Sequence, residues 1–470
     1  MEVILKKNED YIVEIEDLSN EGTGVAKISG FPVFIKGAIT GDKVKIRIVK
    51  VKKNYAFGIV LELLTASRDR TTERCPVAKQ CGGCQLQHMT YESQLSFKQK
   101  KVLDCMERIA GLREELASGA IEVLPILGMD DEPFYYRNKA QFPVGYDKNG
   151  EIVTGFYAGR THSIIPSDTC HIQNPVCEPI LQSVKEYMQQ AGVKAYDEAT
   201  GKGIVRHILI RTGRKTKDIM VCLVINADKL PKEQMLTDKL ISINADINSI
   251  VLNINKERNN VILGRESRCI YGNPYIEDYI GEVKYRISSQ SFYQVNPIQT
   301  EKLYRAALSF ANLTGNEIVW DLYCGIGTIS LFLAQKAKMV YGVEIVPQAI
   351  ENAKSNAKLN HIENTEFFVG AAEEVLPDKY EKSNQAMRAD VIVVDPPRKG
   401  CDTKLLDTLV KMQPDRIVYV SCDPATLARD VKILGENGYR VEKLQACDMF
   451  PQTVHVETVV QLVNIGVKPD

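Results

Sequence analysis

The fold is decided by the stretch Ile318-Val-Trp-Asp321-Leu-Tyr-Cys-Gly325-Ile-Gly327-Thr328. Its first five residues form the apolar run of a buried strand, and Asp321 lies near the end of that strand. Gly325 and Gly327 allow a tight turn, and the residues from Thr328 to position 337 have helical spacing. A strand, a glycine turn and a helix in this order predict the first unit of an α/β fold.

Strands and helices alternate through the rest of the C-terminal region. We expect strands at 339–345, 366–369, 390–394, 416–420, 439–447 and 455–463, and helices at 347–359, 403–412 and 424–436. This alternation predicts a parallel, doubly wound sheet, because each crossover through a helix returns the chain to the same edge. The last two strands are close together in the sequence, which predicts an antiparallel pair at one edge of the sheet.

Residues 1–63 have the pattern of a small all-β module, with short β-rich runs separated by glycines. Apolar residues at positions 44, 46 and 48 alternate with cations at positions 43, 45 and 47. This period of two predicts an apolar inner face and a cationic outer face. We expect a small barrel of the OB type, a fold that often binds oligonucleotides. A solvated strand face gives the same alternation.

Residues 64–285 are expected to form a central domain, which leaves residues 286–470 for the α/β domain. The segment 64–90 contains cysteines and has the composition of a loop. Residues 91–115 have helical spacing and are a candidate to pack on the C-terminal domain. Runs of β-branched and aromatic residues between 122 and 285 predict a β-rich or mixed α/β fold.

The bulk composition is that of an ordinary globular protein. The 470 residues are 44% hydrophobic and 25% charged, and the net charge is −1. No signal-peptide pattern opens the chain, and no run reaches the roughly 18 apolar residues of a membrane span, so we expect a cytoplasmic protein. The local charge is less even, because residues 27–53 hold eight Lys and Arg residues against one acid, Asp42.

The glycine turn predicts a nucleotide-like cofactor, because ligands in open α/β sheets bind at the carboxyl ends of the strands. Glu344, at the end of the next strand, can accept hydrogen bonds from both ribose hydroxyls. A nicotinamide site would use the same acid, but Ser330 replaces the third glycine of that motif. Asp321 can also hold a cationic ammonium group, which favours S-adenosylmethionine. A glycine turn without any ligand is the plainer alternative.

Two further motifs follow strands that should end at the same edge of the sheet: Asp395-Pro-Pro-Arg398 and Ser421-Cys422-Asp423-Pro424. Cys422 stands between a strand and a proline-started helix, and a helix N-terminus favours negative charge and hence a thiolate. Asp395 can accept a hydrogen bond from a ring N–H. Together they predict a thiol that attacks a flat pyrimidine ring, although a lone cysteine at a strand end is usually a core residue.

These motifs resemble those of the RNA uracil-5-methyltransferase family. The resemblance rests on the two motifs above and on Gln294-Val-Asn296, Asp321-Leu-Tyr323-Cys-Gly325, Glu344 and Phe450-Pro-Gln-Thr-Val-His455-Val-Glu457. It covers nearly the whole chain and includes an N-terminal RNA-binding barrel of the TRAM type. It is closest to the 23S ribosomal RNA branch, because the transfer-RNA branch lacks the barrel and the cysteine cluster.

The resemblance implies a Rossmann-like class I methyltransferase domain at the C-terminus and assigns roles to the motif residues. Cys422 would be the nucleophile and Glu457 the general base. S-adenosylmethionine and the uracil would be bound by Gln294, Tyr323, Thr328, Glu344 and Asp395, although some relatives carry Asn in place of Thr328. The roles of Arg398 and His455 stay open.

The implied chemistry explains these residue types. C5 of uracil is a weak nucleophile until a thiolate adds at C6 and generates an enolate. C5 can then take the methyl group, and a carboxylate within hydrogen-bond reach can remove the C5 proton so that the thiolate leaves. The target atom is inaccessible in a stacked helix, so we expect a flipped uridine in a single-stranded loop of 23S ribosomal RNA.

A second group of candidate ligands is the cysteine cluster Cys75, Cys81 and Cys84, with spacing C-x5-C-x2-C, followed by Cys170. Thiolates at such spacings hold zinc or an iron–sulfur cluster, and Cys177 competes with Cys170 for the fourth place. The resemblance favours a [4Fe-4S] cluster on the first four.

Two other functions fit part of this pattern. An RNA cytosine-5-methyltransferase uses similar thiol chemistry, and a cluster-bearing RNA-binding protein without catalysis would need only the barrel and the cysteines. Among the cations, Arg137, Lys139 and Arg206 could contact phosphates, although strand-edge cations often have no such role. We expect a monomer without an obligate protein partner.

Overall fold

The computed structural model describes residues 5–159, 161–167, 169–384 and 386–466. The ends of the two terminal predicted domains, residues 1–4 and 467–470, lie outside this range. The chain folds as two compact units. The first is built from the chain up to Lys101 together with residues 158–161 and 450–455, and the second from the remaining segments.

The first unit contains a six-stranded sheet with the order β1-β5-β6-β4-β3-β2. Its strands are β1 (Asp10–Glu14), β2 (Asp17–Leu18), β3 (Gly24–Ile28), β4 (Phe31–Lys36), β5 (Lys43–Val51) and β6 (Ala56–Thr65). Glu16, just after β1, donates its backbone N–H to Val25 on β3 (2.9 Å), which brings the two ends of the strand order together. The predicted alternation is confirmed, because Val44, Ile46 and Ile48 are fully buried.

A buried acid, Asp42, ties the β4–β5 connection to the segment after β6. Its carboxylate accepts hydrogen bonds from the backbone N–H groups of Ile39 (2.8 Å) and Ser67 (3.0 Å) and from the guanidinium of Arg70. The single acid of the cationic stretch 27–53 is therefore a structural residue.

The predicted helix 91–115 is broken into three parts: α1 (Tyr91–Cys105), a π-helical turn at Met106–Ala110, and α2 (Arg113–Ser118). A π turn inserts one extra residue and so rotates the apolar face. Ala110 is therefore buried, while Ile109, which the helical spacing placed on the apolar face, is 40% exposed.

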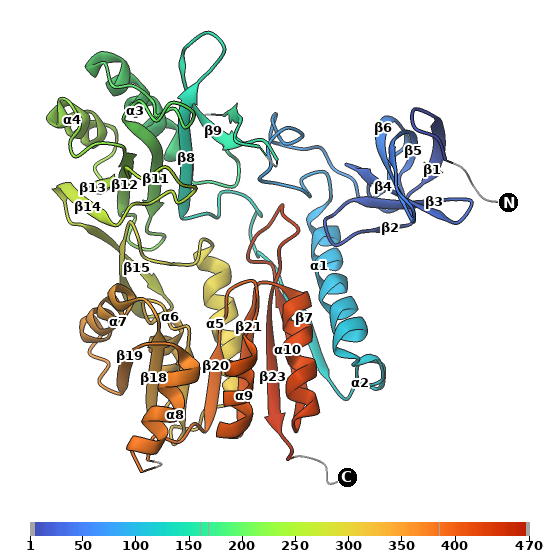
Figure 1. Ribbon diagram of the computed structural model, residues 1–470, viewed down its shortest axis with the longest axis vertical. Coiled ribbons are helices and arrows are strands. Elements are labelled where there is room, and N and C mark those ends of the chain that lie inside the picture. Colours follow the sequence, from blue (N-terminus) through green and yellow to red (C-terminus); the bar gives the residue numbers. More distant parts are fainter. Residues whose placement is uncertain (1–4, 160, 168, 385, 467–470) are drawn as a thin grey trace. The chain divides into compact units, whose positions relative to one another are not determined.

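The second unit contains an eight-stranded sheet with the order β19-β18-β17-β20-β21-β23-β22-β7 (Figure 1). The strands are β7 (Glu122–Leu127), β17 (Ile318–Leu322), β18 (Met339–Glu344), β19 (Thr365–Val369), β20 (Val391–Val394), β21 (Arg416–Ser421), β22 (Tyr439–Cys447) and β23 (Glu457–Asn464). Only β23 runs antiparallel to its neighbours. The doubly wound fold predicted from the sequence is confirmed.

Helices cover both faces of this sheet. One face carries α8 (Ala372–Lys382), α9 (Thr403–Met412), α10 (Pro424–Glu436) and the π-helical turn, whose side chains share one core with Trp320 and the strands. The other face carries α5 (Pro297–Ala311), α6 (Thr328–Ala334) and α7 (Pro347–Leu359). The sequence did not predict α8, which contains an internal proline, Pro377.

The strand β7 differs from the expected domain boundary. It comes from the range assigned to the central domain, yet it pairs in parallel with β22 and forms the end of the eight-stranded sheet. Consequently the expectation that the antiparallel pair β22–β23 lies at the edge of the sheet is wrong, because β7 lies outside it.

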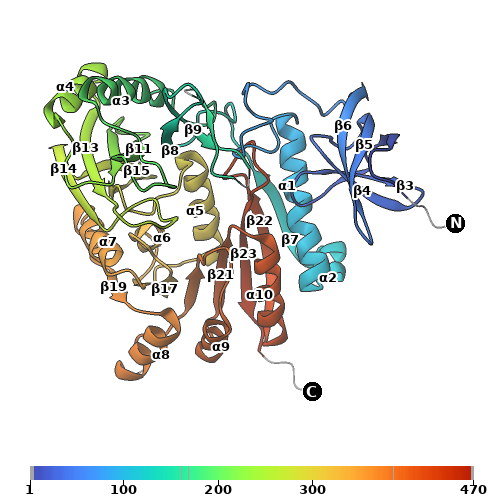
Figure 2. The same ribbon diagram turned by 45° about the horizontal axis from the view of Figure 1, so that its top comes forward.

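A second sheet of the same unit has the order β10-β9-β8-β11-β12-β13-β14 (Figure 2). Its strands are β8 (Lys139–Tyr146), β9 (Ile152–Tyr157), β10 (Ile164–Pro166), β11 (Val205–Thr212), β12 (Ile219–Ile225), β13 (Ile247–Ile254) and β14 (Glu266–Gly272). The helices α3 (Cys177–Ala191) and α4 (Glu233–Ile243) pack on it, and the ribbon of β15 (Tyr275–Ile280) and β16 (Val283–Ser288) leads into α5. Among the described residues, no helix is long and apolar enough to span a membrane.

Candidate active site

The candidate site lies at the carboxyl ends of the parallel strands, where the order of the sheet changes direction between β17 and β20. Such a switch point is where open α/β sheets bind their ligands. The predicted site residues that gather at this edge follow β17, β18, β20 and β21 or begin the antiparallel β23: Tyr323, Thr328, Glu344, Asp395, Cys422 and Glu457.

The turn after β17 requires its glycines. Gly325 and Gly327 have φ angles of 56° and 80°, and Tyr323 also has a positive φ, 68°. A Cβ on Gly327 would lie 3.2 Å from Ala353 and 3.3 Å from the ring of Phe367, so a side chain there would be strained by its φ angle and would push on both neighbours. The turn therefore packs closely against α7 and β19 at Gly327.

Asp321 fits the role of a ligand for a cation. It is fully buried, and its Oδ2 accepts a hydrogen bond from the Ser330 hydroxyl, while its Oδ1 has no hydrogen-bond partner among the described residues. Burial is the main cause that raises the pKa of this carboxyl to about 7; Asp395 and Glu344 contribute to the rise, and the hydrogen bond from Ser330 opposes it. An ammonium group would donate a hydrogen bond to the unpaired Oδ1 and favour the charged form of the Asp321 carboxyl.

Two more residues complete the region that could hold S-adenosylmethionine. Glu344 is half-buried and accepts hydrogen bonds from the backbone N–H groups of Gly325 (3.3 Å) and Val346 (3.0 Å), which fixes its carboxylate beside the turn. The Thr328 hydroxyl accepts a hydrogen bond from the buried Tyr304 (3.0 Å). The residues present therefore fit the predicted ligand.

Cys422 and Glu457 are brought together by the strand register. Ser421 at the end of β21 pairs with Thr458 near the start of the antiparallel β23. Cys422, which follows Ser421, therefore lies level with Glu457, which precedes Thr458. Burial, Glu457 and Asp395 together raise the pKa of the Cys422 thiol to about 12, against the lowering effect of Arg398. Burial also raises the pKa of Glu457, to about 8, and that of Asp395, to about 7.

The expected effect of the helix N-terminus on Cys422 is not what the structure shows. The first N–H groups of α10 are capped by Asp423, whose carboxylate accepts from Ala425 and Thr426 at 3.0 Å. A carboxylate therefore takes the place that the sequence suggested for the thiolate, and Cys422 carries its proton near neutral pH in this state.

The helix α10 also holds the loop that follows Asp395. The Thr426 hydroxyl donates to the carbonyl of Arg398 (3.1 Å), and the Arg429 guanidinium donates to the carbonyls of Lys399 (3.0 Å) and Cys401 (3.1 Å). The fully buried carboxylate of Asp430 accepts from the Cys401 N–H (2.8 Å) and the Tyr419 hydroxyl (2.6 Å).

One helix thus carries the nucleophile before its first turn and holds the loop of Arg398 with its next two turns. The sequence did not single out Asp430 or Arg429. The buried Asp430 is visible only from the fold, because an Arg-Asp pair on a helix is ordinarily solvated.

Gln294 lies between β16 and α5 and is mostly buried. The side-chain amide of Asn138 donates a hydrogen bond to the backbone carbonyl oxygen of Gln294 (2.9 Å). Its neighbour Phe292 is 69% exposed, which is unusual for a phenylalanine and typical of a contact surface. The sequence gave no signal for this exposure, because an isolated phenylalanine predicts a core position.

Two of the three predicted phosphate contacts, Arg206 and Lys139, differ from free surface cations. The guanidinium of Arg206 donates to the carbonyls of Asn255 (2.9 Å) and Glu257 (2.7 Å) and lies over the ring of Tyr196. Burial, with Arg211 and Arg137 nearby, lowers the pKa of Lys139 to about 7. The phosphate prediction for Arg206 is therefore wrong, and Lys139, with a pKa of about 7, is only partly charged near neutral pH.

The cysteine cluster is divided between the two units: Cys75, Cys81 and Cys84 belong to the first and Cys170 to the second. In the described parts of the chain, no group of three or more His, Cys, Asp or Glu side chains is arranged to hold a metal ion. The side chains as they stand do not fit the predicted cluster, which stays a prediction from spacing and resemblance.

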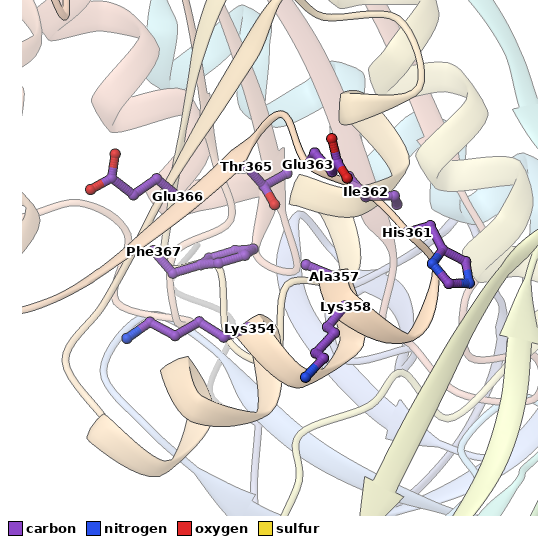
Figure 3. Close-up of a pocket in the computed structure, with 9 residues that line it drawn as sticks. All are labelled: Lys354, Ala357, Lys358, His361, Ile362, Glu363, Thr365, Glu366 and Phe367. Carbon is purple, nitrogen blue, oxygen red and sulfur yellow. The ribbon is translucent and has the colours of Figure 1, made fainter.

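The cavity of about 470 Å³ in Figure 3 lies elsewhere on the sheet. It is lined by the end of α7 and the start of β19, including Lys354, His361 and Thr365. Thr365 pairs with Val340 at the start of β18, whereas Glu344 ends that strand, so the cavity is at the opposite end of the strands from the candidate site.

Known proteins resemble this chain along its whole length. The tRNA (Uracil-5-)-methyltransferase family matches residues 232–465, and the TRAM domain matches residues 5–61. A protein of Halalkalibacterium halodurans named an uncharacterized RNA methyltransferase is 51% identical over 458 residues, 97% of this chain and 98% of the relative. A relative of the same name from Clostridium acetobutylicum is 50% identical over 461 residues, 98% of each chain.

A solved structure shares the fold. The Pyrococcus abyssi tRNA (uracil-54, C5)-methyltransferase in complex with S-adenosyl-L-homocysteine superposes with a TM-score of 0.76 at 29% identity, covering 96% of this chain and 99% of that one. The glycine turn, the unpaired oxygen of Asp321 and the thiol of Cys422 all lie within the residues 232–465 that the family matches. The chain belongs to the family of S-adenosylmethionine-dependent RNA uracil-5-methyltransferases and carries a TRAM domain at its N-terminus.

Proposed function

We propose that this protein methylates C5 of a uridine in 23S ribosomal RNA, with Cys422 as the nucleophile and Glu457 as the general base. The observation that carries the proposal is the register of β21 and β23, which pairs Ser421 with Thr458 and so brings the thiol level with the buried carboxyl at the switch point. The 23S target rests on the resemblance of the cysteine spacing. The barrel does not support it, because a tRNA (uracil-54, C5)-methyltransferase superposes over 96% of this chain, so the expectation that the transfer-RNA branch lacks the barrel is wrong.

When bound, S-adenosylmethionine would supply the methyl group and a positive charge beside Asp321, Glu344 and the turn at Tyr323. Gln294 and Asp395 would hold the uracil, with Asp395 accepting from the ring N3–H. To accept this hydrogen bond, the Asp395 carboxyl must be ionised. Burial raises its pKa to about 7, and an adjacent cation would favour the ionised form. Thr328 would contribute a smaller contact to the methyl donor.

The covalent steps follow from the residues at this edge. The Cys422 thiol gives its proton to solvent and the sulfur adds to C6, so that the C5–C6 electrons move onto the C4 carbonyl oxygen as an enolate. The enolate carbon C5 would take the methyl group as its bond to the sulfonium breaks and S-adenosyl-L-homocysteine leaves, and the Glu457 carboxylate then takes the C5 proton. The C5–C6 double bond then reforms as sulfur leaves C6 with its bonding electrons.

The test is methyl transfer from labelled S-adenosylmethionine to unmodified 23S ribosomal RNA, followed by identification of the nucleoside. We expect 5-methyluridine from the unmodified protein and none from Cys422→Ala. Glu457→Gln should form the covalent RNA adduct but resolve it slowly, which a denaturing gel displays. Rapid normal turnover by Glu457→Gln would contradict its role as the base, and 5-methylcytidine would show that the pyrimidine is wrongly assigned.

A second candidate substrate is transfer RNA. The Pyrococcus abyssi protein, which superposes over 96% of this chain, is a tRNA (uracil-54, C5)-methyltransferase. Incubation of unmodified transfer RNA under the same conditions separates the two substrates. Labelling of transfer RNA alone would replace the 23S assignment and leave the chemistry at Cys422 and Glu457 in place.

A further inference from the structure

The side chain of Tyr304 lies beside the predicted methyl-donor site and takes no part in the chemistry proposed above. Tyr304 is on α5, is 2% exposed, and meets the ring of Phe332 on α6 edge-on at a centroid distance of 6.0 Å. Its hydroxyl donates a hydrogen bond to the hydroxyl of Thr328 (3.0 Å). A buried tyrosine hydroxyl needs a hydrogen-bond partner, and here the partner is a predicted site residue. Tyr304 therefore connects the core of α5 with the predicted methyl-donor site.

Thr328 is held by two buried tyrosines that come from different elements. It is the first residue of α6, and its side chain is only partly buried. Tyr304 binds its hydroxyl, while the fully buried Tyr285 on β16 donates to its backbone carbonyl (3.0 Å). Both the side chain and the backbone of Thr328 are therefore fixed before a ligand binds, which lowers the entropy cost of a contact with this hydroxyl.

The direction of the hydrogen bond between Tyr304 and Thr328 decides what the Thr328 hydroxyl can offer a ligand. A tyrosine hydroxyl carries a single hydrogen, whereas a threonine hydroxyl can accept one bond and donate another. Burial, followed by the nearby Asp395, raises the pKa of Tyr304 well above its usual value, so this hydroxyl keeps its hydrogen and gives it to Thr328. Among the residues that the structure describes, none accepts the hydrogen of the Thr328 hydroxyl. Thr328 is therefore available to the site as a donor.

A donor at this position suits the carboxylate of an amino acid. Ser330, in the same turn of α6 as Thr328, donates to the fully buried Asp321, whose other oxygen is the predicted partner of the ligand's ammonium group. In S-adenosylmethionine the ammonium and the carboxylate are attached to one carbon, so the two groups must lie close together. Asp321, Glu344 and Asp395 are carboxyl groups, which in their ionised forms only accept hydrogen bonds. Thr328 supplies the donor that these acids cannot.

We propose that Tyr304 is a positioning residue for the methyl donor: by donating to Thr328, it leaves the Thr328 hydroxyl as a donor to the carboxylate of S-adenosylmethionine. The inference rests on the proposed function only in placing Thr328 at the methyl donor. Without the Tyr304 hydroxyl, the Thr328 side chain is free to turn its hydrogen toward a backbone carbonyl one turn back, a common bond for threonine in helices. A tyrosine that only filled space in the core would affect all ligands of the site alike.

Ligand binding to the full-length protein, measured by titration calorimetry without RNA, tests this proposal. One probe is S-adenosyl-L-homocysteine, and the other is S-adenosyl-3-thiopropylamine, which keeps the ammonium group and lacks the carboxylate. Tyr304→Phe keeps the ring and removes the hydroxyl. We expect it to weaken the binding of S-adenosyl-L-homocysteine about fivefold, as the loss of one hydrogen bond does, and to leave the binding of the thiopropylamine unchanged.

Variants of Thr328 show whether Tyr304 acts through this residue. Thr328→Val removes the donor and should weaken the binding of S-adenosyl-L-homocysteine about tenfold without changing that of the thiopropylamine. Thr328→Ser keeps the hydroxyl and should keep the preference for the carboxylate. The addition of Tyr304→Phe to Thr328→Val should cause no further loss, because the two side chains form one contact. An additive loss in the double variant would overturn the positioning role.

Tyr285→Phe is the matched control, because it removes an equally buried hydroxyl that bonds the backbone of Thr328 instead of its side chain. The ratio of the two affinities should stay as in the unmodified protein. The proposal is overturned if Tyr304→Phe weakens both probes equally, which indicates a packing role alone, or if it weakens neither of them.

Methylation assays with RNA separate this inference from the proposed function. The binding measurements involve neither RNA nor Cys422, so they do not depend on which nucleoside is methylated. If the unmodified protein methylates RNA and Tyr304→Phe binds both probes normally, only the inference about Tyr304 is wrong. If the unmodified protein methylates no RNA, the proposed function fails, and the two probes still decide whether Tyr304 sets the preference for the carboxylate.

Discussion

At the scale of single residues, the site contains three buried carboxyl groups whose charged forms are disfavoured. Asp321, Asp395 and Glu457 are enclosed at one edge of the sheet, and burial raises the pKa of each to between about 7 and about 8. Arg398 is the cation that opposes this trend at both Glu457 and Cys422. Arg398 is therefore the exposed charge that favours the ionised form of both groups, against burial and the neighbouring carboxyls.

Replacement of Arg398 tests this dependence. In Arg398→Gln the cation that lowers the Cys422 pKa is gone, so the thiol should ionise at higher pH and react more slowly near neutrality. We expect the pH profile of Cys422 alkylation by iodoacetamide, followed by mass spectrometry of its peptide, to move to higher pH. Lys399→Gln removes the neighbouring charge and should leave the profile in place; an unmoved profile in Arg398→Gln would contradict the argument.

At the scale of elements, α10 links the nucleophile to the loop of Arg398. Gly400 in that loop has φ 76°, and a Cβ there would lie 2.6 Å from Asp430 and 2.7 Å from Arg429. The loop therefore fits against the helix only with glycine at this position. The backbone of Arg398 is consequently held by the same helix that follows Cys422.

Asp430→Asn should loosen this loop. The substitution weakens the buried pair with Arg429 and the bonds from Tyr419 and Cys401, so we expect a loss of about 2 kcal/mol in the free energy of unfolding. The alkylation profile of Cys422 should shift as in Arg398→Gln, which a purely structural effect would not produce. Asp407→Asn, on α9, is the control and should change neither quantity.

A second element-scale contact is the Asp42 link after β6. Burial alone would raise the Asp42 pKa, but the bonds from Arg70, Ser67 and Ile39 outweigh it and hold the pKa below its usual value. A carboxyl with a lowered folded pKa stabilises the fold above its unfolded pKa, and this contribution is lost as the pH falls through the folded value.

We therefore expect the peptides around residues 37–42 and 66–70 to lose protection against hydrogen exchange in acid, and Asp42→Asn to lose it already at neutral pH. Asp10→Asn breaks an exposed ion pair on the same sheet and should have little effect. Equal protection in Asp42→Asn and the unmodified protein would show that the link contributes nothing.

At the scale of the whole molecule, the units are not contiguous in the sequence. Residues 450–455 belong to the first unit, where Gln452 exchanges hydrogen bonds with Gln94 on α1 (2.9 and 3.0 Å), and the fully buried Lys98 donates to the carbonyl of Phe450 (3.0 Å). Two residues after this segment the chain reaches Glu457 in the second unit. The backbone that leads to the proposed base is thus fixed by side chains more than 350 positions earlier.

The cysteine prediction also belongs to this scale, because its four ligands come from both units. If Cys75, Cys81, Cys84 and Cys170 hold a [4Fe-4S] cluster, anaerobically purified protein should contain iron and acid-labile sulfide in equal amounts. Cys84→Ser should lose both, while Cys269→Ser should retain them. Zinc in place of iron would show that the spacing was read correctly and the metal wrongly; absence of any metal would remove the cluster altogether.

The sequence by itself determined the doubly wound fold and the positions of most strands and helices from β17 onward, because strand and helix periodicity is a local property. It also determined the motifs whose residues meet at one edge, since the carboxyl ends of parallel strands share that edge. The sequence did not predict the π-helical turn after α1 or the rotation of the apolar face that it causes, because a π turn leaves no local sign in residue spacing.

Only the tertiary structure decided which polar groups are buried. The capping carboxylate of Asp423 displaced the expected thiolate, the guanidinium of Arg206 turned inward, and Asp430 became part of a closed network. The same holds for β7, which left its expected domain for the eight-stranded sheet. Burial and pairing depend on residues far apart in the chain, and a charge in the sequence carries no sign of whether solvent or a partner will surround it.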